Sequence, residues 1–132
     1  MANDKSAARP LSPHLQIYRP MLTMMMSIMH RITGVGLYFG IVLLVWWLTA
    51  ASVSESYFEF VQGFLGHWFG RLLLFGFTWA LIHHALGGLR HLLWDTGRGF
   101  DLNLIEWLAR ANLAGSIVLT LLLWVIGYGV MA

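Results

Sequence analysis

Three long apolar stretches constrain this chain more than any other feature. They cover residues 34–51, about 70–94 and about 112–132. A hydrocarbon core of ~30 Å is crossed by ~20 helical residues, so each stretch is close to the length needed. Backbone groups in lipid must find their hydrogen bonds within the segment, which predicts helices. We therefore expect an all-α membrane protein with three spanning helices. The predicted spans cover about residues 23–51, 68–95 and 110–131.

The composition supports a membrane protein and limits the metal chemistry. Only 11% of the 132 residues are charged and 58% are hydrophobic, whereas about 25% of the residues of an ordinary soluble domain are charged. The chain has no cysteine, which excludes disulfides and thiolate ligands for zinc or iron–sulfur clusters. Any metal chemistry in this chain must use histidine, methionine or carboxylates.

The cationic residues predict the orientation of the chain. Of the eight Lys and Arg residues, only Arg71 lies near the loop between the first two spans, which carries Glu55 and Glu59. The positive-inside rule then places an N-terminal segment, 1–20, in the cytoplasm and the end of the membrane domain, 21–132, outside. The start of the chain lacks the pattern of a signal or transit peptide, which favours a bacterial inner membrane over a mitochondrial one.

A polar stripe interrupts the second span within the sequence HHALGGLRH at 83–91. At ~100° per residue, five residues share one face of the helix. They are His84, Gly87, Gly88, His91 and Asp95. Exposing an ionisable side chain to lipid costs roughly 3 kcal/mol or more, so such residues face a protein interior or a polar cavity. A buried neutral imidazole beside glycines suits an axial haem ligand. A histidine that bridges helices and a glycine pair that packs closely fit the same pattern.

Two neighbours of His84 differ in their expected roles. His83 lies about 100° around the helix from His84, so we expect it to pack or to form hydrogen bonds outside the stripe. Arg90 and His91 lie about 10 Å closer to the cytoplasmic end of the helix. They are therefore candidates to meet haem propionates.

A second polar stripe lies at the start of the first span. Ser27, His30 and Arg31 fall on one face of a helix together with Thr23 and Gly34. A hydroxyl and a fixed cationic donor four residues apart suit a ligand that carries carbonyl oxygens, such as a quinone. The surrounding methionines supply adaptable apolar walls. A helix end whose cations meet lipid headgroups is the alternative interpretation for Arg31.

Three segments resemble one family. SPHLQIYRP at 12–20, SIMHRITGVGLY at 27–38 and HALGGLRHLLWD at 84–95 resemble the cytochrome b subunits that form the larger membrane anchor of succinate dehydrogenase, respiratory complex II. The resemblance implies a helical bundle with a second anchor subunit. It also implies that a flavoprotein subunit oxidises succinate and an iron–sulfur subunit passes electrons to ubiquinone, while this chain is a non-catalytic anchor and electron-transfer subunit.

The resemblance also implies residue roles. His84 matches the ligand of haem b, and the second anchor subunit supplies the other axial histidine. His30, Arg31 and His91 are candidates for the propionates, and Gly87 and Gly88 for the haem pocket. Ser27 and Arg31 match quinone-site residues, and Asp95 is expected to orient Arg31 or a water molecule near the quinone.

Three alternatives follow from the same residues. The cytochrome b subunit of another quinone-linked oxidoreductase is expected to have more paired histidines within its spans. In a haem-free structural anchor, His84 and His91 would bridge helices and Ser27 would pack. In a small transporter the polar stripes would line a path, but the first and third spans lack the acidic residues that ion coupling uses.

Overall fold

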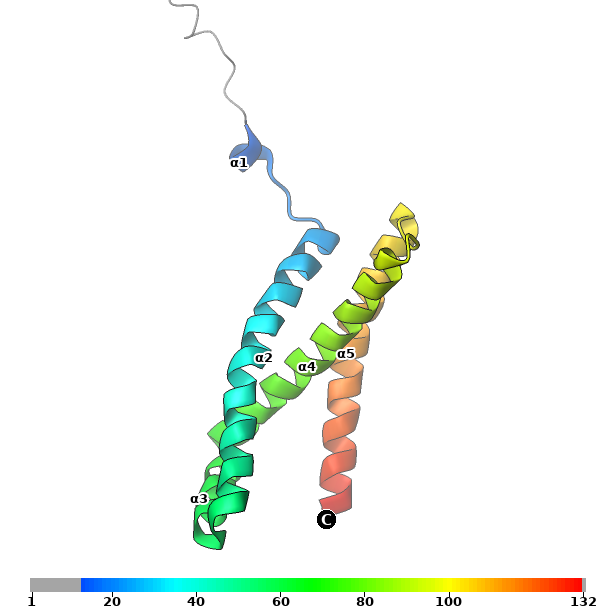
Figure 1. Cartoon of the computed structure of the whole chain (residues 1–132). Coiled ribbons are helices and arrows are strands. Elements are labelled where there is room, and N and C mark those ends of the chain that lie inside the picture. The colour runs from blue at the N-terminus through cyan, green and yellow to red at the C-terminus, as the bar shows by residue number, and fades with distance from the viewer. Residues whose placement is uncertain (1–12, 132) are drawn as a thin grey trace, which may run out of the picture.

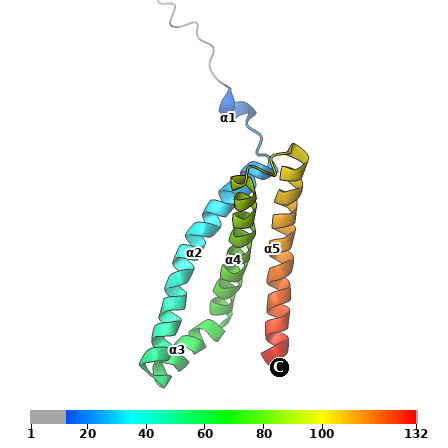
Figure 2. The ribbon, with the colours of Figure 1, turned by 45° about the vertical axis from the view of Figure 1, so that its right-hand side comes forward.

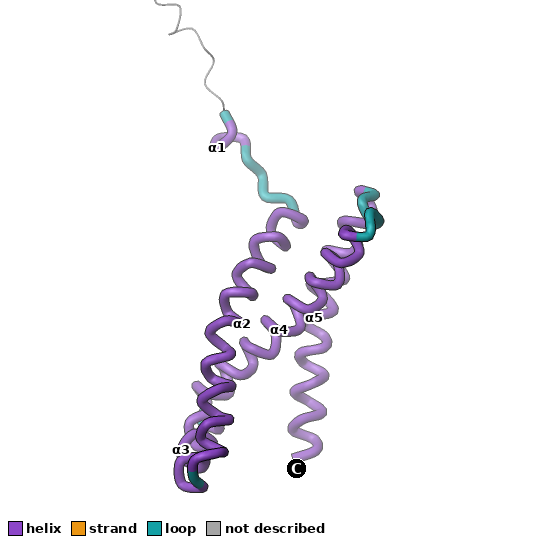
Figure 3. The backbone as a smooth tube through the Cα atoms, in the orientation of Figure 1, coloured by secondary structure: helices purple, strands orange, loops and turns teal. Residues whose placement is uncertain are grey.

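The computed structural model describes residues 13–131, and within them every regular element is a helix (Figure 3). Three of these helices are long and apolar enough to cross a membrane. The expected all-α fold with three candidate spans is therefore confirmed. The helices are α1 (His14–Ile17), α2 (Leu22–Val53), α3 (Glu55–Gly66), α4 (Trp68–Asp95) and α5 (Leu102–Met131).

The three long helices lie side by side with α4 in contact with both of the others (Figures 1 and 2). The start of α2 and the connection between α4 and α5 lie at one end of the molecule. The short helix α3 and the end of α5 lie at the other. Gly97 and Gly99 take positive φ angles of 74° and 81° in the α4–α5 connection, a conformation that glycine adopts at no steric cost.

The predicted outer loop with Glu55 and Glu59 is a helix, α3, so that part of the expectation was wrong. Ser54 caps it, since its side chain accepts a hydrogen bond from the Tyr57 backbone N–H at 3.3 Å. The Tyr57 hydroxyl accepts in turn from Trp46 Nε1 on α2 at 2.8 Å. Helix α3 therefore packs back along the end of α2, and hydropathy alone gave no sign of this.

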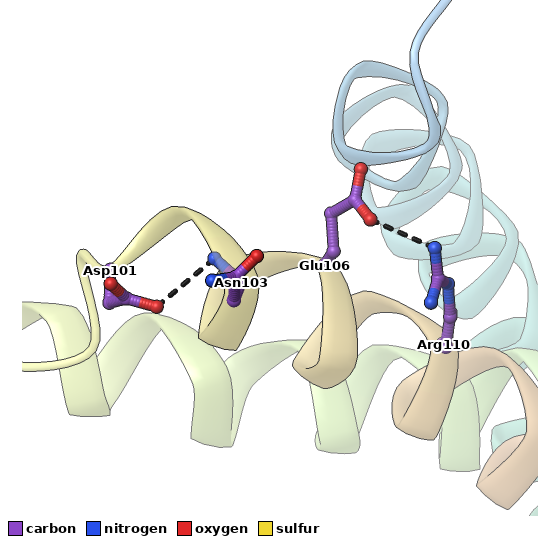
Figure 4. A network of polar contacts seen from close by, with 4 residues as sticks. All are labelled: Asp101, Asn103, Glu106 and Arg110. Atoms are coloured by element: carbon purple, nitrogen blue, oxygen red, sulfur yellow. Dashed lines mark hydrogen bonds and ion pairs between the residues drawn. The ribbon is translucent and has the colours of Figure 1, made fainter.

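Helix α5 begins earlier than the expected third span, at Leu102 rather than at about 110. Asp101 caps it by accepting from the backbone N–H groups of Asn103 and Leu104 at 3.0 and 3.1 Å. One turn later Arg110 and Glu106 form an ion pair of 2.8 Å (Figure 4). Asn103, Glu106 and Arg110 interrupt the apolar sequence of these first turns, so the uninterrupted apolar stretch begins only after them.

Candidate functional site

Two histidines and two glycines interlock where α2 crosses α4. A Cβ atom placed on Gly34 of α2 would lie 3.0 Å from Cε1 of His84 on α4. A Cβ atom on Gly87 of α4 would overlap the ring of His30 on α2. Each helix thus removes a side chain where the other inserts an imidazole, and no larger residue fits at Gly87 without moving His30.

The neighbours of His84 on α2 indicate which of its ring nitrogens carries the proton. Its Nδ1 lies 3.0 Å from the backbone carbonyl oxygen of His30 and 3.4 Å from the Thr33 hydroxyl. A carbonyl oxygen only accepts, so Nδ1 carries the proton and donates it. The Nε2 lone pair of the neutral ring has no hydrogen-bond partner in the described part of the chain. His84 thus presents one fixed nitrogen and one open nitrogen, as a metal-binding histidine does.

The rings of His30, His84 and His91 form a cluster. His30 stacks on His84 with ring centroids 3.9 Å apart and planes 14° from parallel. His91 lies 4.9 Å from His30 by ring centroids. Nε2 of His30 is buried and has no hydrogen-bond partner among residues 13–131. The cluster therefore contains a second nitrogen without a hydrogen-bond partner in the described residues.

His83 faces the other neighbour of α4. It is fully buried, and its Nδ1 lies 3.1 Å from the Ser116 hydroxyl of α5. Its Nε2 lies 3.5 Å from the Asn112 amide nitrogen, and its ring lies 5.0 Å from that of Trp79. The prediction that His83 packs and forms hydrogen bonds outside the stripe is confirmed.

Arg90 does not share the surface of the stripe. Its guanidinium lies over the ring of Trp94, with 5.1 Å from Cζ to the ring centroid, and its side chain lines a cavity between α4 and α5 together with Asn112. Six residues after His84, it is rotated by about 120° from that histidine on a helix. Arg90 thus lies on a different side of α4 from His84, and the expectation that it contacts a haem propionate stays a prediction.

Ser27 and Arg31 lie one turn apart near the start of α2, and both are exposed. Asp95 is the last residue of α4 and is also exposed. Within residues 13–131 no ion pair joins Arg31 to Asp95, so the suggested role of Asp95 stays a prediction. A Cβ on Gly88 would meet no atom within 4 Å, which leaves that side of α4 open.

Comparison with known proteins gives a consistent assignment. The family model described as "Succinate dehydrogenase/Fumarate reductase transmembrane subunit" matches residues 5–123. The chain is 46% identical over 122 residues to the succinate dehydrogenase cytochrome b556 subunit of Paracoccus denitrificans, which covers 92% of this chain and 94% of the relative. The corresponding subunit of Rickettsia conorii is 38% identical over 89% of this chain and 91% of its own length.

A mitochondrial relative matches a smaller part of this chain. The cytochrome b560 subunit of Sus scrofa is 42% identical over 98 residues, which cover 71% of this chain and 57% of the relative. The matches to the family model and to the two bacterial subunits extend over nearly the whole chain and include both polar stripes. The chain therefore belongs to the family of succinate dehydrogenase/fumarate reductase transmembrane subunits and is a membrane subunit of that enzyme complex.

Proposed function

We propose that this chain binds one haem b through His84 and helps to form the ubiquinone-reduction site of succinate dehydrogenase. The observation that carries the haem proposal is the hydrogen bond that fixes one ring nitrogen of His84 and leaves the other without a partner in the described residues. Its Nδ1 proton is held by the His30 carbonyl at 3.0 Å, which leaves the Nε2 lone pair for iron. The names of the bacterial relatives, cytochrome b556 subunits, support the same cofactor.

The residues of the cluster fit a haem that is shared with another subunit. In residues 13–131 no three candidate side chains are grouped around a single metal ion, but haem iron takes only its two axial ligands from protein. His30 is stacked parallel to His84, so the two rings cannot approach one iron from opposite sides. We infer that the second axial histidine comes from the second anchor subunit.

The remaining polar groups have roles at the rim of this pocket. When bound, haem b supplies a one-electron redox centre within the membrane. Nε2 of His30 has no hydrogen-bond partner within residues 13–131, and His91 and Arg31 lie exposed toward the same end of the molecule. We assign these three residues to the propionates, and Gly88, whose missing side chain leaves open space, to the pocket wall.

The haem assignment is tested on the purified four-subunit complex. A reduced-minus-oxidised optical spectrum of the native complex should show a b-type haem, and His84→Ala should remove or alter that signal. His67→Ala, a histidine at the opposite end of α4, is the matched control and should leave the spectrum unchanged. A native complex without a haem signal would instead favour the haem-free structural anchor.

The quinone proposal rests on Ser27 and Arg31. Quinone reduction takes two electrons and two protons, and the electrons must come from an iron–sulfur cluster of another subunit because this chain has no cysteine. The Ser27 hydroxyl can donate to a quinone carbonyl, and Arg31, one turn away, can stabilise negative charge that develops on the ring oxygen. Asp95, exposed at the end of α4, is positioned to exchange protons with water.

A serine exchange tests this site. Ser27→Ala should lower quinone-dependent turnover about tenfold, as expected for one lost hydrogen bond to a charged oxygen. Succinate oxidation with a soluble artificial acceptor should persist. Ser52→Ala, at the far end of the same helix, is the control. Unchanged quinone reduction in the Ser27 variant would contradict the assignment.

The partners and the membrane follow from the same proposal. The flavoprotein and iron–sulfur subunits bind at the cationic, N-terminal end, residues 1–20, of which residues 1–12 lie outside the described residues. The second anchor subunit packs against the membrane domain, 21–132, and completes the haem site. We assign the complex to a bacterial inner membrane, with the N-terminus in the cytoplasm.

A further inference from the structure

A groove of 630 Å³ lies between the three long helices in the half of the molecule that contains α3 (Figure 2). Apolar side chains form most of its walls, among them Leu43 and Leu44 of α2, Phe77 of α4 and Leu123 of α5. Helix α3 contributes Leu65. The groove is within the size range of small-molecule sites, ~300–1,000 Å³, and its walls suit an apolar chain.

Two polar side chains of the groove use their acceptor atoms within the chain. The Thr78 hydroxyl donates to the Leu74 carbonyl at 2.7 Å and accepts from Trp124 Nε1 at 3.3 Å. Oε1 of Gln62 accepts from Trp47 Nε1 at 3.3 Å. Because an indole nitrogen only donates, this contact fixes the amide oxygen of Gln62 toward Trp47 and leaves its NH₂ group as a donor.

The other polar side chains of the groove add a positive charge and a further donor. Arg71 and Tyr128 both line the groove and are both exposed, and Cζ of Arg71 lies 5.9 Å from the centroid of the Tyr128 ring. Within residues 13–131 no ion pair involves Arg71. The acidic residues of α3, Glu55 and Glu59, do not line the groove. An apolar ligand with a negatively charged, acceptor-rich end therefore complements it.

The cation lies at the level of lipid headgroups. Arg71 is three residues after Trp68, the first residue of α4, which is about 4.5 Å along the helix. Trp68 is exposed, and Tyr128 lies three residues before the end of α5 at Met131. Tryptophan and tyrosine are enriched where spanning helices meet the headgroups. Arg71 can thus contact a phosphate while the apolar walls continue toward the middle of the bilayer.

We propose that this groove binds an anionic phospholipid, such as phosphatidylglycerol, from the leaflet at the α3 end. The phosphate accepts from the Arg71 guanidinium, which prefers oxyanions. The NH₂ group of Gln62 and the Tyr128 hydroxyl donate to further oxygens of the headgroup, and one acyl chain lies along the leucines. An ethanolamine headgroup fits less well, because its ammonium group adds a second cation and no carboxylate lines the groove.

The test compares two lipids on the whole complex. The purified complex is reconstituted into vesicles of equal parts phosphatidylglycerol and phosphatidylethanolamine with identical acyl chains. It is then re-extracted with enough detergent to remove loosely bound lipid, and the retained lipid is identified by mass spectrometry. We expect phosphatidylglycerol to be enriched about fivefold, the effect of one cation near a lipid surface.

Two variants locate the bound lipid. Arg71→Gln removes the cation and should abolish the enrichment. Gly127→Leu should do the same while Arg71 stays in place, because Gly127 lines the groove and a Cβ there meets no atom within 4 Å. Gly129→Leu, at an equally open glycine that does not line the groove, and Arg98→Gln, at an exposed cation of the α4–α5 connection, are the matched controls and should keep it.

Three results would overturn the proposal. The first is equal retention of the two lipids by the native complex. The second is an enrichment that survives Gly127→Leu or that Gly129→Leu also removes. The third is a Gly127→Leu complex that purifies without the second anchor subunit, which would show that a helix of that subunit, and not a lipid, fills the groove.

Discussion

His83 and His84 are adjacent in the chain, and the structure gives them opposite environments. His83 points to α5, and both of its ring nitrogens lie near polar atoms, at Ser116 and Asn112. His84 points to α2, where only Nδ1 is engaged. A histidine with two occupied nitrogens is a packing residue, whereas a histidine with one fixed and one open nitrogen is prepared to bind a metal.

The two interfaces of α4 also differ in how their polar residues pack. At the α4–α5 interface, Asn112, Ser116 and Thr120 of α5 are all buried beside α4, and such polar residues join helices inside a membrane. At the α2–α4 interface, Gly34 and Gly87 admit the imidazole rings of His84 and His30. Among residues 13–131, buried polar atoms without a partner occur at both interfaces, so the difference lies in the inserted rings.

The largest effect is expected from Gly87→Val. The new side chain would collide with the His30 ring and push it away from His84, at an overpacking cost of about 3 kcal/mol. We expect the purified complex to lose most of its b-type haem. Gly76→Ala on the same helix, where a Cβ meets nothing within 4 Å, is the control. A normal haem content in Gly87→Val would show that the interlocked glycines do not shape the pocket.

A smaller effect, on stability alone, is expected from His83→Ala. Removing this buried ring deprives Ser116 and Asn112 of their partner, which costs about 2 kcal/mol. A thermal unfolding scan of the complex should show a lower midpoint, while the reduced-minus-oxidised haem spectrum stays as in the native complex. Loss of the haem signal in this variant would remove the distinction between the two histidines.

The smallest effect is expected from Thr33→Val. The exchange keeps the shape of the side chain but removes the hydroxyl 3.4 Å from Nδ1 of His84. A hydrogen-bond acceptor at this nitrogen makes the ring a more basic ligand, so its loss should raise the haem midpoint potential. A redox titration should show a rise of up to about 60 mV, which is a tenfold change for one electron. A lowered potential would contradict the role of Thr33.

The sequence predicted the long helices and the polar faces because both follow from local periodicity. The residues of the candidate haem site on α4 lie three or four positions apart in the sequence. For this reason His84, Gly87 and His91 could be grouped without coordinates. The spacing of Ala109, Asn112, Ser116 and Thr120 on α5 carries a similar signal for the α4–α5 interface.

Features that depend on two helices could not be predicted. The placement of Arg90 toward α5, the insertion of His30 beside Gly87 and the support of His84 by the His30 carbonyl all depend on how α4 sits between its neighbours. Helix α3 was missed for a related reason, since its packing against Trp46 and Trp47 of α2 leaves no mark in a hydropathy profile.

The most direct test is an electron cryo-microscopy map of the complete complex in lipid. We predict that the haem iron is bonded to Nε2 of His84, that Nδ1 of the same ring faces the His30 carbonyl, and that a histidine of the second anchor subunit occupies the opposite axial position. Iron bonded to His30 or His83, or a complex without haem between the anchor subunits, would contradict the assignment of the two histidines.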